Sequence, residues 1–243
     1  MTFLRSLAFN VAFFGWTAIL CVVLAWAPLL PRPKMMAIVR WYLRTLCWLE
    51  RTVINLRYEV RGREYLPNGP YLVAAKHQSA WETLKLHLVL PDPAVVLKRE
   101  LTRLPIWGWF AVKAEMIPVD RGARGRAVVS LLDGARRVMA QGRPIVIFPQ
   151  GTRTAPGTHH PYRIGVIMLY EQLGLPIVPM ALNSGVYWPR KAFRKRAGTV
   201  IIEFLPPILP GLERLDALRT LESRLEAATD RLVTAAGGAL PNP

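Results

Sequence analysis

The segment 76–82, which reads KHQSAWE, carries a histidine and a carboxylate at a spacing that suits acid–base chemistry. His77 follows a short apolar run, and Glu82 comes five residues later, where a helical pattern begins. Open α/β sheets place their ligands at the turn between a strand and a helix. A carboxylate that holds one imidazole nitrogen leaves the other free as a general base. Ser79 and Glu82 also match a capping box, so the spacing alone predicts either a catalytic pair or a plain helix cap.

A second segment, 148–154, reads FPQGTRT and is suited to binding a phosphate group. It places a glycine-bearing polar loop with Arg153 directly after an apolar run. The backbone N–H groups of such a loop and a guanidinium both donate to phosphate oxygens, although an ordinary strand-ending turn has the same composition. Two other predicted strands deliver a cation at or just after their ends, Lys98 and Arg121.

Apolar runs and amphipathic stretches alternate along the chain from about Leu56 onward. The alternation predicts an α/β fold with a mixed, largely parallel sheet that is flanked by helices. Pro176 and Pro179 favour the sheet edge or a pocket wall for their strand. Helices are predicted over 79–90, 126–140, 164–173 and 212–235, and strands over 56–61, 71–75, 94–97, 116–119, 144–148, 176–182 and 199–204.

Residues 6–31 carry no charged side chain and are rich in large apolar residues. About 20 apolar residues are enough for a helix to cross the ~30 Å hydrocarbon core of a bilayer. We predict a retained membrane helix rather than a cleaved signal peptide or a buried helix of a soluble protein, because no small-residue cleavage site precedes Arg32. Cations are more numerous after this run than before it, which places its C-terminal side in the cytoplasm.

The following segment, 35–56, mixes tryptophans and other apolar residues with Arg40, Arg44 and Arg51. At helical spacing the three arginines fall roughly along one side. This pattern favours a helix that lies in the membrane interface over an ordinary core helix. The chain is therefore predicted to comprise N-terminal membrane-associated helices over 1–55 and an α/β domain over 56–243.

The 243 residues include 32 Lys and Arg against 16 Asp and Glu, a formal net charge of +16, although 52% of the residues are hydrophobic. This composition excludes a largely disordered chain and indicates an anionic partner, such as a membrane surface or an anionic substrate. The cation-rich segment 190–196 suits anionic lipid headgroups. Two cysteines make no disulfide framework, no metal-binding spacing is present, and no nucleic-acid-binding motif accompanies the charge.

In their order along the chain, these segments resemble the motif blocks of the glycerolipid acyltransferase family, and in particular its bacterial lysophosphatidic acid acyltransferases. The family's first block is a histidine, four residues and an acid, which His77 and Glu82 match. Its second block ends in an arginine, matched by Arg121. Its third reads Phe-Pro-Glu-Gly-Thr-Arg, matched by 148–153, and its fourth is the proline-bearing strand, here 177–180.

The resemblance implies transfer of a fatty acyl group from acyl-ACP or acyl-CoA to the 2-hydroxyl of 1-acyl-sn-glycerol 3-phosphate (lysophosphatidic acid), forming phosphatidic acid in phospholipid biosynthesis. It implies that His77 is the general base and that Glu82 orients it, with no metal or bound cofactor. It also implies a cell (inner) membrane location, with the catalytic domain on the cytoplasmic face. The acceptor phosphate would be held by Lys98, Arg121 and Arg153, with Gly151 and Thr152 as supporting loop residues.

Two residues depart from the family's usual pattern. Glu82 stands where Asp is most common; it is one methylene longer but can still orient His77. Gln150 stands in the place of a glutamate, so no acid–base role is expected there. The alternatives are a related acyltransferase that acts on another lyso-lipid, such as lyso-ornithine lipid, and a non-catalytic membrane protein that binds anionic lipid.

Overall fold

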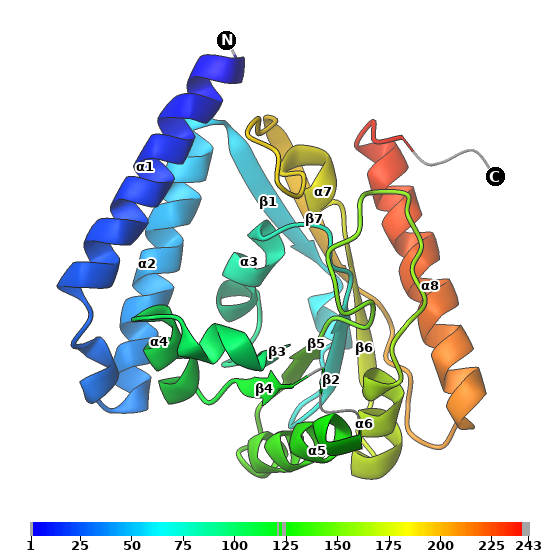
Figure 1. Ribbon diagram of the computed structural model, residues 1–243. Coiled ribbons are helices and arrows are strands. Elements are labelled where there is room, and N and C mark those ends of the chain that lie inside the picture. Colours follow the sequence, from blue (N-terminus) through cyan, green and yellow to red (C-terminus); the bar gives the residue numbers. More distant parts are fainter. Residues whose placement is uncertain (1, 121, 123–124, 240–243) are drawn as a thin grey trace.

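The computed structural model describes residues 2–120, 122 and 125–239. A seven-stranded sheet lies at its centre (Figure 1). Neighbouring strands are parallel except for one antiparallel pair, β6 and β7, so the predicted mixed, largely parallel sheet is confirmed. In spatial order the strands are β1 (Leu56–Arg61), β7 (Gly198–Phe204), β6 (Ile177–Leu182), β2 (Leu72–Ala75), β5 (Ile145–Ile147), β3 (Ala94–Lys98) and β4 (Ile117–Val119).

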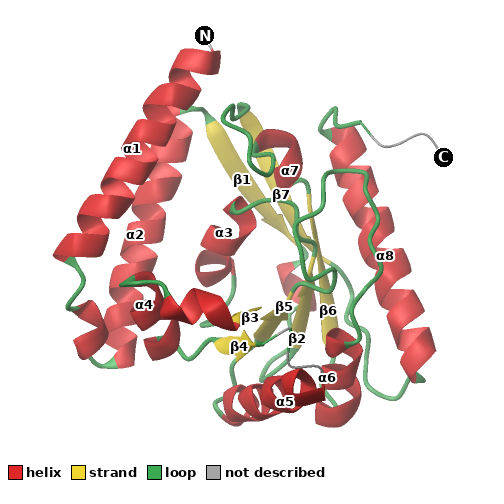
Figure 2. Cartoon of the chain, in the orientation of Figure 1, coloured by secondary structure: helices red, strands yellow, loops and turns green. Residues whose placement is uncertain are grey.

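Helices cover both faces of the sheet (Figure 2). The alternation of side chains along β2 explains why, since successive residues point to opposite faces. Leu72 and Ala74 belong to one buried core, and Val73 and Ala75 belong to another. The first core packs against α5 (Gly125–Ala140), α6 (Gly165–Leu173) and α8 (Arg214–Ala235). The second core packs against α1 (Thr2–Val23), α2 (Arg32–Val53), α3 (Trp81–Val89) and the short α7 (Ser184–Tyr187). Helix α4 (Trp107–Lys113) lies against α2.

The predicted strand over 176–182 is observed as β6. Of the two positions that its prolines favoured, a sheet edge or a pocket wall, the edge is wrong, because β6 lies between β2 and β7. The antiparallel pairing with β7 covers only Met180–Leu182. Beyond it, the carbonyl oxygen of Pro179 accepts from the Leu205 amide at 2.9 Å. The N–H and C=O of one strand residue point to the same side. The missing N–H of Pro179 therefore faces β7, between the regular pairing and the isolated antiparallel bridge of Ile177 with Ile208, where the pairing is irregular.

Strands β6, β2, β5, β3 and β4 all run in the same direction. Their carboxyl ends therefore meet at one edge of the sheet, the edge at which open α/β sheets bind ligands. His77 follows β2, the loop 148–154 follows β5, and Lys98 is the last residue of β3. The topology thus brings the predicted site segments to a common edge.

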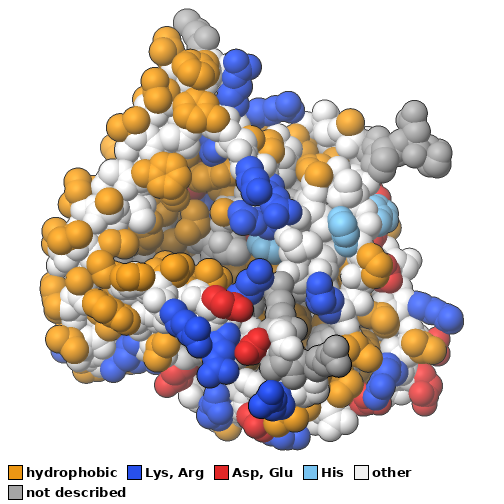
Figure 3. All heavy atoms as spheres, viewed as in Figure 1, with side chains coloured by type: hydrophobic (Ala, Val, Ile, Leu, Met, Phe, Trp, Pro, Cys, Tyr) orange, Lys and Arg blue, Asp and Glu red, His pale blue; other side chains and the backbone are white. Residues whose placement is uncertain are grey.

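Helices α1 and α2 lie side by side and are joined by polar contacts, including Trp16 Nε1 to Thr45 Oγ1 at 2.8 Å (Figure 1). By its length and composition, α1 could cross a membrane, and only 17% of its most apolar window is buried. On α2, the side chains of Trp41 and Trp48 are exposed. Figure 3 shows hydrophobic side chains gathered over this side of the molecule. The exposed apolar surface supports an association with the membrane.

A buried ion pair connects α2 to the rest of the fold. The carboxylate of Glu50 accepts from Lys85 Nζ at 2.9 Å and from Trp81 Nε1 at 3.0 Å, and both donors lie on α3. The cation-rich segment 190–196 packs on α1, where the Lys195 amide donates to Ser6 Oγ at 3.0 Å. Both contacts therefore help to fix the N-terminal helices against the α/β part.

Candidate active site

The side chains of His77 and Glu82 are in direct contact. His77 Nδ1 lies 2.8 Å from Glu82 Oε1. The imidazole also stacks on the ring of Phe148, which follows β5, with ring centroids 4.1 Å apart. The His77 side chain retains 16% of its exposure, whereas that of Glu82 is fully buried. Since an ionised carboxylate only accepts hydrogen bonds, Nδ1 carries the proton and Nε2 keeps its lone pair in the neutral ring.

The same carboxylate also holds the turn that leads into α3, whose N-cap residue is Ala80. Glu82 Oε1 accepts from the amides of Gln78 and Ser79, both at 2.8 Å, and Oε2 accepts from Ser184 Oγ at 2.7 Å. The amide of Trp81 in turn donates to Ser79 Oγ at 3.1 Å. The capping box and the histidine pair are therefore not alternatives. The contacts that begin the helix also fix the carboxylate that faces His77.

The loop after β5 is held against the turn that carries His77. The carbonyl oxygen of His77 accepts from the Thr154 amide at 2.7 Å. Gly151 is buried with a φ of +68°, a left-handed conformation in which a side chain would be strained. The Gly151 amide donates to Phe148 O at 2.9 Å, and Thr152 is exposed. The sharp turn at Gly151 thus brings Thr152 and Arg153 to the surface beside His77.

The predicted phosphate-binding cations lie at this edge as far as the structure describes them. Lys98 is exposed at the end of β3, and Arg153 is half-buried. Among the described residues, neither side chain is paired with a carboxylate, so both charges are available to an anion. Arg121 lies outside the described residues, but β4 ends two residues before it, at the same edge. β3 is two strands from β2, a separation of about 10 Å.

A buried polar network beneath the site was not predicted from the sequence. Glu226, on α8, forms an ion pair with Lys76 Nζ. Its carboxylate also accepts hydrogen bonds from Gln150 Nε2 at 3.1 Å and from the Tyr162 hydroxyl at 2.6 Å. The Lys76 side chain is 1% exposed and that of Glu226 is 8% exposed. Burial and the nearby Glu226 charge raise the pKa of Tyr162, so its hydroxyl stays protonated and donates. One carboxylate therefore connects the residue before His77 to the loop after β5.

Ser184 was also not predicted from the sequence. It begins α7, two residues beyond the end of β6, and its hydroxyl donates to Glu82. The neighbouring Gly185 amide donates to Gln78 Oε1 at 3.0 Å. The available signal was positional, because Ser184 follows a strand that is parallel to β2 and ends at the same sheet edge. Neither its residue type nor its spacing from Glu82 indicated the contact.

The surface near this sheet edge combines apolar and basic character. Figure 3 shows a hollow with hydrophobic side chains on the side of α2 and α4 and with Lys and Arg side chains along its border. Arg190 extends this basic border, since its Nη1 donates to the backbone oxygen of Arg153 at 3.1 Å. No group of three or more His, Cys, Asp or Glu that could hold a metal ion occurs in the part of the chain that the structure describes. Such a surface suits a lipid with an anionic headgroup.

Comparisons with known proteins identify the family. A family model described as Acyltransferase matches residues 57–183. The chain is 36% identical over 202 residues to the 1-acyl-sn-glycerol-3-phosphate acyltransferase of Pseudomonas aeruginosa, a match that covers 83% of this chain and 79% of that protein. It is 32% identical over 170 residues to the 1-acyl-sn-glycerol-3-phosphate acyltransferase alpha of Mus musculus, covering 68% and 60% of the two chains.

The fold has a counterpart among solved structures. The crystal structure of the 1-acyl-sn-glycerophosphate (LPA) acyltransferase PlsC from Thermotoga maritima matches with a TM-score of 0.75. The match covers 96% of this chain and 99% of that chain at 16% sequence identity, so it bears on the fold. The family model and the sequence relatives show that this chain belongs to the acyltransferase family.

Proposed function

We propose that this acyltransferase moves a fatty acyl group from acyl-ACP or acyl-CoA to the 2-hydroxyl of lysophosphatidic acid, forming phosphatidic acid. The observation that carries the proposal is the contact of 2.8 Å between His77 Nδ1 and Glu82 Oε1 at the sheet edge where Lys98 and Arg153 also lie. The names of the two sequence relatives support the choice of acceptor.

In the proposed reaction, His77 acts as the general base. Nε2 accepts the proton of the acceptor hydroxyl while the hydroxyl oxygen attacks the thioester carbonyl carbon. The new C–O bond forms, the C–S bond breaks, and the proton passes from the imidazolium to the departing thiolate. General-base assistance of this kind accelerates a reaction by roughly 10²–10⁴-fold. The mechanism needs neither a metal nor a bound cofactor.

Glu82 acts by orienting and stabilising His77. Its carboxylate accepts from Nδ1, which keeps the lone pair on Nε2, and its negative charge stabilises the imidazolium that forms during the attack. Three further donors, from Gln78, Ser79 and Ser184, prevent the carboxylate from turning away. The extra methylene of glutamate relative to aspartate does not prevent this geometry.

The acceptor phosphate is bound by Lys98, Arg121 and Arg153 in this proposal. Charge-assisted hydrogen bonds from a guanidinium to phosphate are among the strongest that a protein can offer. The hydrophobic side of the hollow in Figure 3 suits acyl chains, and helices α1 and α2 hold the site beside the bilayer. We place the enzyme at the inner membrane with its site on the cytoplasmic face, on the basis of the cations that follow α1.

The proposal is tested by incubating the purified full chain in detergent micelles with each thioester donor and with either lysophosphatidic acid or lyso-ornithine lipid, with analysis of the products by mass spectrometry. We expect phosphatidic acid whose new acyl group is that of the donor. Acylation of lyso-ornithine lipid without formation of any phosphatidic acid would show that lyso-ornithine lipid, and not lysophosphatidic acid, is the acceptor. Lipid binding without acyl transfer would contradict the proposal altogether.

A further inference from the structure

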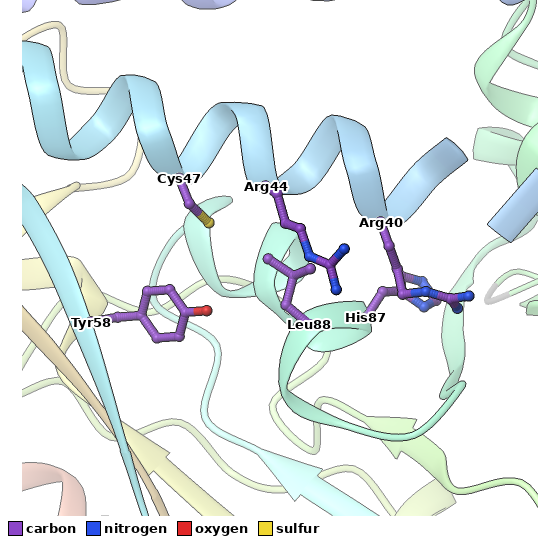
Figure 4. Close-up of a pocket in the computed structure, with 6 residues that line it drawn as sticks. All are labelled: Arg40, Arg44, Cys47, Tyr58, His87 and Leu88. Atoms are coloured by element: carbon purple, nitrogen blue, oxygen red, sulfur yellow. The ribbon is translucent and has the colours of Figure 1, made fainter. Parts of the chain in front are cut away.

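A pocket of about 230 Å³ lies between α2 and α3 (Figure 4). It lies toward the opposite end of α3 from the turn that carries His77. None of its lining residues is among the predicted site residues. They are Arg40, Arg44, Cys47, Tyr58, His87 and Leu88.

Two unpaired cations face this pocket. Arg40 and Arg44 are four residues apart on α2, and both project toward α3 in Figure 4. Within the described part of the chain, neither guanidinium has an ion-pair or hydrogen-bond partner. Like charges at this helical spacing repel each other. An anion bound between them would remove the repulsion.

Two further polar side chains line the pocket, His87 and Tyr58. The Nδ1 atom of His87 is buried and has no accessible surface, so it does not face a ligand in the pocket. Burial lowers the pKa of His87 to about 4, which leaves the ring neutral near pH 7, so it adds no charge to the two arginines. The hydroxyl of Tyr58 points into the same space (Figure 4).

We infer that this pocket binds the phosphate group of an anionic phospholipid, held by Arg40 and Arg44. The lipid source follows from the position of the pocket on α2. Trp41 and Trp48 on the same helix are 47% and 66% exposed, and tryptophan side chains settle at the depth of lipid headgroups. This phosphate site is separate from the acceptor site at the carboxyl edge of the sheet.

The test measures phosphatidylglycerol binding by the purified full chain in nonionic micelles. This lipid is neither the acceptor nor the product of the proposed reaction, so its binding reports on the pocket rather than on the active site. Phosphatidylcholine is the neutral lipid control, and inorganic phosphate is the soluble competitor. The double variant Arg40→Gln/Arg44→Gln is compared with Arg51→Gln/Arg57→Gln, which removes two exposed cations outside the pocket.

At an ionic strength that screens general surface attraction, we expect Arg40→Gln/Arg44→Gln to weaken phosphatidylglycerol binding by about tenfold or more. The control variant should stay within about twofold of the wild type, and neither variant should lose acyl transfer in neutral micelles. Equal loss of binding in both double variants would show that the pocket is not the binding site. Displacement of phosphatidylglycerol by dilute inorganic phosphate would show that the site binds free phosphate rather than a lipid headgroup.

Discussion

Exchanging the amide of Gln150 and the carboxylate of Glu226 tests whether the buried network beneath the site supports catalysis. Glu226 neutralises Lys76, which precedes His77, and accepts from Gln150, which precedes Gly151. Gln150 occupies a place where the family usually carries a glutamate. We interpret Gln150 and Glu226 together: Glu226 supplies from α8 the carboxylate that the loop does not.

The structure sets the size of each effect. Glu226→Gln leaves the Lys76 ammonium, 1% exposed, without a counter-charge. Breaking a buried pair in this way destabilises a protein by about 3–5 kcal/mol, which corresponds to a Tm lower by roughly 10 °C for a chain of this size. Gln150→Glu places a second carboxylate within hydrogen-bond reach of the first, where both cannot remain ionised without strong repulsion. Both single variants should also lower kcat, because the network positions the two loops of the site.

The double variant Gln150→Glu/Glu226→Gln restores one carboxylate and one amide to the network. We expect it to recover at least about 2 kcal/mol relative to the sum of the single effects and to regain most of kcat. Tm by calorimetry and kcat at a temperature well below every Tm give the two readings. Additive losses in the double variant would refute the reasoning, and recovery of Tm without kcat would reduce the network to a structural role.

Three further predictions follow from individual contacts. Ser184→Ala removes one donor to Glu82, so kcat should fall about tenfold with the acceptor KM unchanged, and Ser184→Thr should retain activity; equal kcat in all three proteins would contradict this. Arg153→Ala should raise the acceptor KM about tenfold or more and leave the donor KM nearly unchanged, as steady-state kinetics would show. The pKa of His87 is lowered by burial to about 4, so the unfolded chain binds more protons between pH ~6.5 and ~4 and the free energy of unfolding should fall by about 3 kcal/mol across that interval as the pH decreases. His87→Gln should lose this part of the pH dependence of Tm, and parallel curves for the two proteins would contradict the explanation.

The sequence was informative where the signal is local. The contact between His77 and Glu82 spans one strand-to-helix turn, so spacing alone was enough to suggest it. The alternation of apolar runs predicted the class of the sheet, and helical spacing predicted α5 to within one residue of its observed start at Gly125.

Contacts between distant parts of the chain could not be predicted in this way. Ser184 and Glu82 are 102 residues apart, and Lys76 and Glu226 are 150 apart. Glu226 lies in a charge-balanced helix, where its carboxylate looks like any solvated surface charge. Periodicity also gives no strand order, so the prolines of β6 favoured a sheet edge or a pocket wall, and nothing in the sequence showed that the strand lies inside the sheet.

The role of His77 as the general base is tested most directly by measuring kcat for acyl transfer to lysophosphatidic acid with the wild type and with His77→Ala. The account predicts that the variant folds with an unchanged circular dichroism spectrum and loses at least about 10²-fold in kcat. A correctly folded His77→Ala protein that turns over at the wild-type rate would contradict it.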